Sequence, residues 1–179
     1  MPPDDLDAWL PHPVVRTRHE RRVAAPAEVL WEAALGVRLS DTRTLGRLVR
    51  WRIPGTPEDE TYRAIFAHYP FVLLADGPGW SLSGLCGRIW TLQRDYPRLG
   101  DPEAFRTWDR PGTVRVLFAH WVQDADDGTS TIVSEARVAA TDRAARLRLR
   151  SMWAVMGVFE RLIGAEPLAV AAERAAQRR

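Results

Sequence analysis

One long apolar stripe near the C-terminus constrains this chain more than any other feature. After Asp142, a favourable N-cap residue, apolar side chains recur at spacings of 4, 3, 4, 3 and 4. These spacings place them on one face of a helix of about five turns, with most arginines off that face. Such a helix needs a broad apolar surface to lie on, and Gly164 and Pro167 are expected to break or kink it. The stripe consists of Ala145, Leu149, Met152, Met156, Phe159 and Ile163.

The clearest strand signal directly precedes this helix. Residues 113–124 and 129–140 are typical of two antiparallel strands joined at Asp127-Gly128, a dipeptide that favours the positive backbone dihedrals of a tight turn. If these two residues form the turn, the strand pairing follows from it. The predicted facing pairs are His120 with Glu135, Phe118 with Arg137 and Trp121 with Ser134.

Shorter elements are expected before this hairpin. A strand at about 14–24 is followed by a helix from Pro26 to Leu35, where proline takes its favoured first position, and by a second short helix from Asp41 to Arg50. Residues 1–13 are expected to be a tail, with Leu6, Trp9 and Leu10 docking on the body, and residues 14–179 a single domain.

The middle of the chain predicts a second hairpin and a long connection. An apolar run from Tyr69 to Ala75 ends in a Gly- and Pro-rich turn, and Trp80 to Leu92 is the return strand. Residues 93–112 are rich in Pro, Asp and Arg, and we expect this connection to serve as a lid or pocket rim.

Composition argues against several classes of protein. The 179 residues are 46% apolar and 27% charged, which is typical of a soluble globular domain. No window approaches the ~18 uninterrupted apolar residues of a membrane span. All 25 basic residues are arginines scattered among 23 acidic residues, so the net charge is +2 and no nucleic-acid partner is expected. The acidic, proline-bearing start and the single cysteine, Cys86, predict a cytoplasmic location.

Known motifs for metal, phosphate or nucleophile chemistry are missing from the sequence. The four histidines are dispersed, without HExxH or a Cys/His cluster. The glycines form neither GxxxxGK[ST] nor GxGxxG, and there is no GxSxG nucleophile elbow. We therefore expect neither a metal ion nor a cofactor.

Four stretches resemble one known family. They are Arg22-Val-Ala-Ala-Pro-Ala-Glu-Val-Leu-Trp31, Gly84-x-x-Gly-Arg-x-Trp90, Phe105-x-x-Trp-x-x-Pro-Gly112 and Thr131-x-x-Ser-Glu-Ala-Arg-Val138. From about residue 14 onward the chain resembles the START-like superfamily, also called SRPBCC or Bet v 1-like. The resemblance implies an α+β helix-grip fold, in which a curved antiparallel sheet wraps around a long C-terminal helix and two short helices follow the first strand.

The resemblance also implies a hydrophobic cavity between the sheet and the long helix. Members bind lipids, sterols, hormones or polyketides there, and some cyclise polyketide chains. We therefore expect a hydrophobic small-molecule ligand: a lipid, polyketide, isoprenoid or aromatic metabolite. The alternatives are a cyclase or dehydratase acting on a polyketide-like substrate, and a protein-interaction module without a small ligand. A monomer or a homodimer is expected, and the expected cavity wall consists of Trp90, Trp121, Leu149, Met152, Trp153, Met156 and Phe159.

His120 and Glu135 are the candidate catalytic residues. In the predicted register they are cross-strand neighbours, and a carboxylate beside an imidazole tunes it towards a general base near neutral pH. The alternative is an ordinary ion pair on a solvent-facing side of the sheet. That alternative is favoured because the opposite face of the two strands is the more apolar, with Leu117, Trp121, Ile132, Ala136 and Val138.

Overall fold

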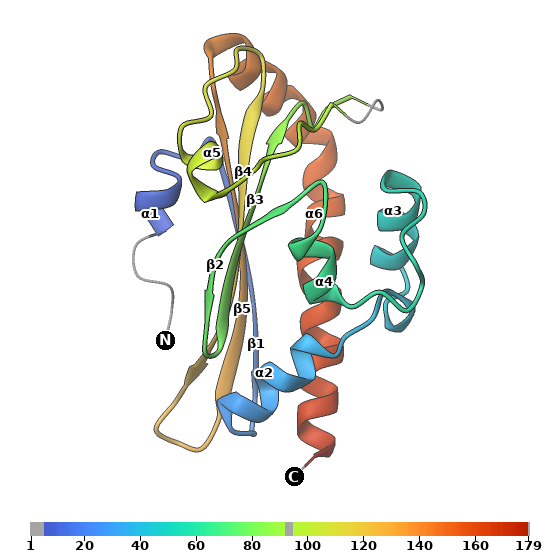
Figure 1. Cartoon of the computed structure of the whole chain (residues 1–179). Helices are drawn as coiled ribbons and strands as arrows, with labels where there is room; N and C mark the ends of the chain where they lie inside the picture. The colour runs from blue at the N-terminus through green and yellow to red at the C-terminus, as the bar shows by residue number, and fades with distance from the viewer. Residues whose placement is uncertain (1–5, 92–94, 179) are drawn as a thin grey trace.

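A single antiparallel sheet forms the centre of the protein. The computed structural model describes residues 6–91 and 95–178, with their side chains except at residue 52 and residues 154–163. Within these residues five strands are arranged in the order β1-β5-β4-β3-β2 (Figure 1). They are β1 (Val15–Val23), β2 (Val72–Gly77), β3 (Trp80–Gly87), β4 (Val114–Asp124) and β5 (Ser130–Ala140).

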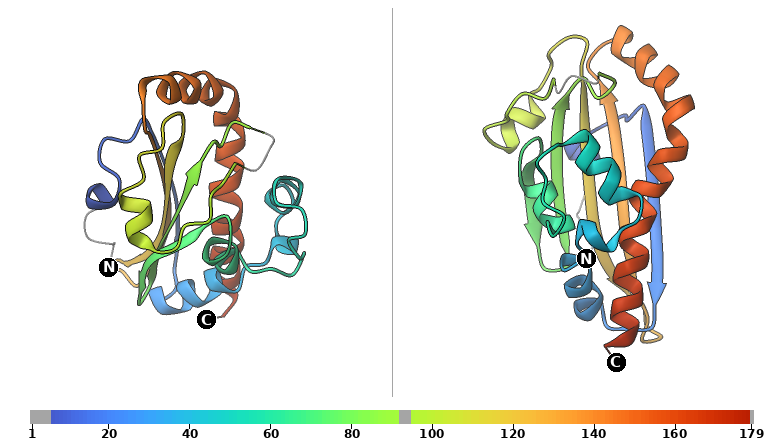
Figure 2. Two further views of the ribbon diagram at one scale, coloured as in Figure 1. Left: turned by 45° about the horizontal axis from the view of Figure 1, so that its top comes forward. Right: turned by 90° about the vertical axis from the view of Figure 1, so that its right-hand side faces the viewer.

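Helices cover both faces of this sheet (Figures 1 and 2). The long α6 lies on one side together with α2, α3 and α4, and we call this the inner face. Helices α1 and α5 lie on the other side, the outer face. The chain is therefore α+β, with the predicted antiparallel sheet, short helices after β1 and long C-terminal helix. The helices are α1 (Leu6–Trp9), α2 (Ala27–Leu35), the 3-10 turn η1 (Leu39–Asp41), α3 (Leu45–Arg52), α4 (Tyr62–Ala67), α5 (Pro102–Arg106) and α6 (Arg143–Gln177).

The turn between β4 and β5 is longer than predicted. The Ala125 N–H donates to the Thr129 carbonyl at 2.8 Å, and the Gly128 N–H donates to the Ala125 carbonyl at 3.3 Å. Gly128 has a φ of +74°, so the loop has three residues and ends in a left-handed glycine, one of the common hairpin connections. One more loop residue moves every cross-strand pair by one position.

The predicted pairing of His120 with Glu135 is therefore wrong. His120 faces Ser134, Glu135 faces Ala119, and Trp121 faces Val133. Because side chains alternate along a strand, this shift puts His120 on the inner face and Glu135 on the outer face. The pairing of Phe118 with Arg137 is corrected in the same way, since Phe118 faces Ala136.

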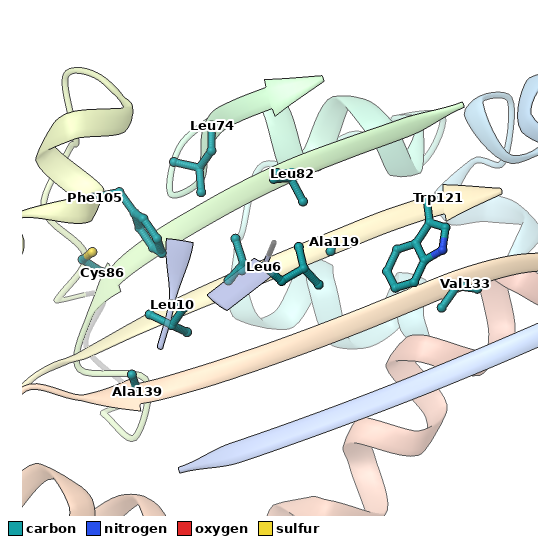
Figure 3. Close-up of a cluster of buried hydrophobic side chains, with 11 residues drawn as sticks. Leu6, Leu10, Leu74, Leu82, Cys86, Phe105, Ala119, Trp121, Val133 and Ala139 are labelled. Carbon is teal, nitrogen blue, oxygen red and sulfur yellow. The ribbon is translucent and has the colours of Figure 1, made fainter. Parts of the chain in front are cut away.

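The outer face is covered by segments from both halves of the chain. Leu6 and Leu10 are buried against it, which confirms the expectation that the N-terminal segment docks on the body. Phe105 of α5 is fully buried in the same cluster, and a Cβ on Gly84 would stand 2.6 Å from its Cδ2 (Figure 3). Helix α5 thus packs on the outer face, and it does not form the predicted lid or rim.

Helix α6 is not broken at Gly164 and Pro167, the two residues expected to break or kink it. It runs from Arg143 to Gln177 with Pro167 inside, and Figure 2 shows it crossing one end of the sheet before it follows the inner face. At its start the Asp142 carboxylate accepts the Ala145 N–H at 2.7 Å, the predicted N-cap. Gly164 lies against β1, where a side chain would collide with His19.

Candidate functional site

An apolar cavity of about 100 Å³ lies between the inner face of the sheet and helices α2, α4 and α6. It forms where α4 and α6 stand on either side of α2, so that its walls come from segments far apart in the sequence. Most of these walls are aromatic or aliphatic. The wall residues include Trp31 and Leu35 of α2, Tyr62 and Phe66 of α4, Ile132 of β5, and Pro167 and Leu168 of α6.

The cavity reaches the surface beside the edge strand β2. Leu73 of β2 lines the cavity and is 38% exposed, and Arg63 of α4 lines it from the other side. The Arg63 guanidinium pairs with the Asp76 carboxylate, with 3.2 Å between Nη2 and Oδ2. A pair of opposite, partly exposed charges therefore stands at the opening.

His120 lines the cavity from the centre of the sheet. Its side chain is buried at 8% exposure, and its Nε2 atom has no hydrogen-bond partner among the described residues. The rings of Phe66 and Tyr62 lie against it, with centroids at 4.9 Å and 5.3 Å. This burial lowers the pKa of His120 to about 4, so the imidazole is neutral at pH 7.

A row of polar residues crosses the inner face at the level of His120. His19 of β1 faces Ser134 of β5, Ser134 faces His120, and His120 faces Ser81 of β3. Ser81 in turn faces Asp76 of β2, so each strand contributes one member. Of this row, His120 and Ser81 line the cavity, and Ser83 of the next inner-face position along β3 lines it as well.

Helix α4 supplies a further polar group near the cavity, and sequence reasoning did not foresee this helix. The Tyr62 side chain lies close to Ser134, and burial raises the pKa of this tyrosine, so it stays protonated. The sequence does contain a signal for α4. Thr61 caps it by accepting the Ala64 N–H at 3.2 Å, and Tyr62, Ile65 and Phe66 follow at helical spacing.

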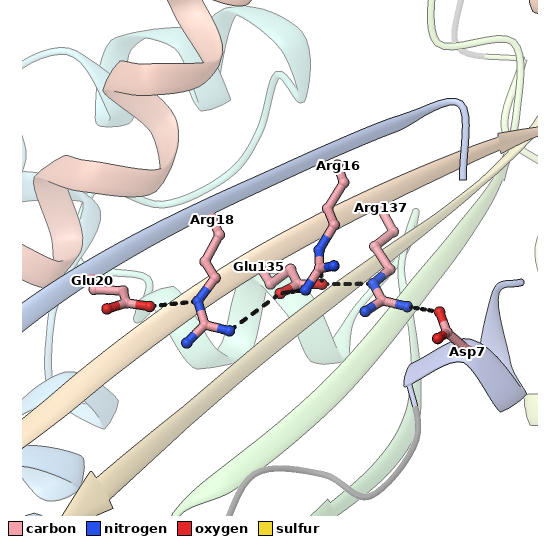
Figure 4. A network of polar contacts seen from close by, with 6 residues as sticks. All are labelled: Asp7, Arg16, Arg18, Glu20, Glu135 and Arg137. Carbon is pink, nitrogen blue, oxygen red and sulfur yellow. Dashed lines mark hydrogen bonds and ion pairs between the residues drawn. The ribbon is translucent and has the colours of Figure 1, made fainter. Parts of the chain in front are cut away.

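Glu135 belongs to a separate ionic network on the outer face (Figure 4). Its side chain is 1% exposed, and its carboxylate accepts hydrogen bonds from Arg137 at 2.6 Å and Arg16 at 3.0 Å. Arg137 also pairs with Asp7 of α1 at 2.5 Å, and Arg18 lies 3.8 Å from the same carboxylate. Arg137 thus links the N-terminal helix to Glu135 of the sheet, on the side away from the cavity.

The aromatic and aliphatic residues expected in the cavity wall are divided between three places. Trp121 is buried in the outer-face cluster, with the Arg18 guanidinium 5.2 Å from its ring centroid, so it does not line the cavity. Trp90, Leu149, Met152 and Trp153 pack together on the inner face with Val114, Val116 and Val138, beyond the cavity. The side chains of Met156 and Phe159 lie outside the described residues. A role of the inner-face group in ligand binding remains a prediction.

Two further features concern other kinds of site. Among the residues that the structure describes, no three His, Cys, Asp or Glu side chains gather in a way that would hold a metal ion. Within the same residues, no helix combines the length and the hydropathy that crossing a bilayer requires.

The comparisons with known proteins found similar proteins only among solved structures. No protein-family model matches this chain, and no curated protein matches it. The Zhui aromatase/cyclase from Streptomyces sp. R1128 is 17% identical over 92% of this chain and 94% of that chain, with a TM-score of 0.32. Norcoclaurine synthase from Thalictrum flavum is 15% identical over 92% and 85%, with a TM-score of 0.31. A hypothetical protein from Helicobacter pylori is 8% identical over 94% and 93%, with a TM-score of 0.40. At these values the likenesses carry no argument about function, and the helix-grip description rests on the sheet and α6 themselves.

Proposed function

We propose that this protein binds a hydrophobic small molecule in the cavity between the inner face and helices α2, α4 and α6. The observation that carries the proposal is the composition of the cavity wall. Aromatic and aliphatic side chains surround a few polar groups, of which Ser83 and His120 are buried. Ligand pockets combine an apolar wall with a small number of polar groups in this way.

The cavity volume limits what the enclosed part of the ligand can be. An apolar cavity of about 150 Å³ accommodates one benzene molecule. The cavity here is about 100 Å³, two thirds of that volume, so it encloses part of one ring or a short branched chain. A longer lipid or polyketide chain would therefore extend through the opening beside Leu73 and Arg63.

Proton-transfer catalysis is less well supported than binding. A general base works best when its pKa lies near the working pH. Burial holds the pKa of His120 at about 4, and Glu135, the expected tuning carboxylate, lies on the other face of the sheet. The cavity thus offers shape and a few neutral polar groups, which are the requirements of a binding site.

Filling the cavity tests the proposal. Ala34 lines the cavity on α2, and Ala34→Leu should reduce the affinity for small aromatic probes at least tenfold, read from intrinsic tryptophan fluorescence and thermal shift. Ala104→Leu on α5 is the matched control, since it makes the same change at a half-buried helical alanine on the outer face. If a broad screen of aromatic and aliphatic probes yields no shift with the unmodified protein, the binding proposal fails and an interaction module becomes the better account.

A further inference from the structure

The Nε2 atom of His120 is the least satisfied polar atom of the cavity. Buried polar groups in folded proteins nearly always have a hydrogen-bond partner. This atom has none among the described residues, although its side chain is more than nine-tenths buried. The imidazole lines the cavity, but Nε2 itself has almost no accessible surface, so a partner held in the cavity reaches Nε2 when the ring turns.

The charges around the cavity favour a neutral partner. The imidazole is uncharged at pH 7, because burial disfavours its protonated form. Arg63 and Asp76 stand at the opening and neutralise each other. An ionised group placed beside His120 would lose its hydration without gaining an opposite charge.

The surrounding rings favour a flat, aromatic partner. Phe66 and Tyr62 present tilted and edge-on rings to His120, at interplanar angles of 56° and 68°. Aromatic rings pack well in such edge and offset arrangements. Trp31 adds a further aromatic wall, and the enclosed volume takes part of one ring, with the rest in the opening.

We propose that the group held in the cavity is a neutral hydroxylated aromatic ring, a phenol-type ligand whose hydroxyl hydrogen-bonds to Nε2 of His120. This inference rests on the binding function proposed above. A hydroxyl suits both tautomers of a neutral imidazole, because it donates to a bare ring nitrogen and accepts from an N–H. A carbonyl suits one tautomer, and a hydrocarbon suits neither.

Phenol and toluene form a pair of probes that tests this assignment. They have equal numbers of non-hydrogen atoms, and they differ in a hydroxyl against a methyl group. Affinities are measured by NMR titration of the full chain, wild type and His120→Leu. The preference for phenol over toluene should fall about tenfold in His120→Leu, which corresponds to about 1.4 kcal/mol. The difference in hydration between the two probes cancels, because both proteins are compared with the same pair.

Two more variants keep the result interpretable. Trp121→Phe removes another buried N–H without a partner among the described residues, from the neighbouring position but on the outer face, and it should leave the preference unchanged. His120→Gln retains a polar group at the cavity floor and should retain part of the preference, and it replaces His120→Leu if that variant does not fold. In the wild type, the ¹⁵N resonance of His120 Nε2 should move with phenol and much less with toluene.

The possible outcomes separate this inference from the proposed function. Binding of both probes with the same preference in wild type and His120→Leu overturns the phenol-type ligand and leaves hydrophobic binding intact. An equal ¹⁵N response to both probes also overturns it. Failure of both probes to bind the wild-type protein argues against the proposed function itself.

Discussion

Gly164 of α6 and His19 of β1 lie in direct contact, so that a Cβ on Gly164 would stand 2.1 Å from Cδ2 of the imidazole. This contact sets how closely the C-terminal part of α6 approaches the sheet. Pro167 and Leu168, which line the cavity, follow within a turn. A glycine inside a helix usually destabilises it, and here it allows the close approach.

We expect Gly164→Ala to lower the free energy of unfolding by about 1–3 kcal/mol, because overpacking outweighs the gain in helix propensity of about 1 kcal/mol. In a His19→Ala background the same change should stabilise the protein, since the collision is gone. Urea denaturation of the four proteins measures this coupling. Gly100→Ala, where no atom lies within 4 Å of the added carbon, is the control. Additive effects of the two substitutions would contradict the contact.

The pKa of His120 predicts a loss of stability in mild acid. Burial lowers this pKa from 6.5 to about 4, so the unfolded chain binds a proton at a higher pH than the folded protein does. The stabilisation is complete above pH 6.5 and is lost as the pH falls towards 4, at about 1.4 kcal/mol per pH unit. Denaturation of wild type and His120→Gln at pH 7 and pH 5 checks this. The wild type should lose more stability than the variant, and equal losses would disprove the assignment.

The outer-face network predicts unequal effects for its two carboxylates. Glu135→Gln removes the charge that pairs with the buried Arg137, and breaking a buried pair in this way destabilises by about 3–5 kcal/mol. Asp7→Asn changes a partner that is 72% exposed, and it should lower stability by about 1 kcal/mol or less. Chemical denaturation gives both values. Where Glu135→Gln remains folded, its affinity for a cavity ligand should match that of the wild type, and a lost affinity would contradict the placement of Glu135 on the outer face.

Much of the architecture follows from local patterns. The apolar stripe and the Asp142 cap predicted the start of α6, and Ala145 and Leu149 of that stripe are fully buried. The β4–β5 hairpin and the docking of Leu6 and Leu10 were also predictable. These features depend on the spacing of residues within one segment, and this spacing can be read directly from the sequence.

The register and the site depended on tertiary structure. Asp127-Gly128 fits a two-residue turn, and Asp126-Asp127-Gly128 fits a three-residue turn equally well by composition. A difference in hydrophobicity between the two faces of β4 would have indicated which turn forms. Both faces are buried, however, and most residues from Val114 to Val122 are apolar.

The location of the cavity also depends on tertiary structure, because α2, α4, α6 and four strands meet there from distant parts of the sequence. By itself the sequence determined which segments form the helices and the sheet, since periodicity is local. The tertiary structure alone decided that His120 faces the cavity and Glu135 the outer face, because burial on both sides of β4 removed the hydrophobic contrast that sets a register.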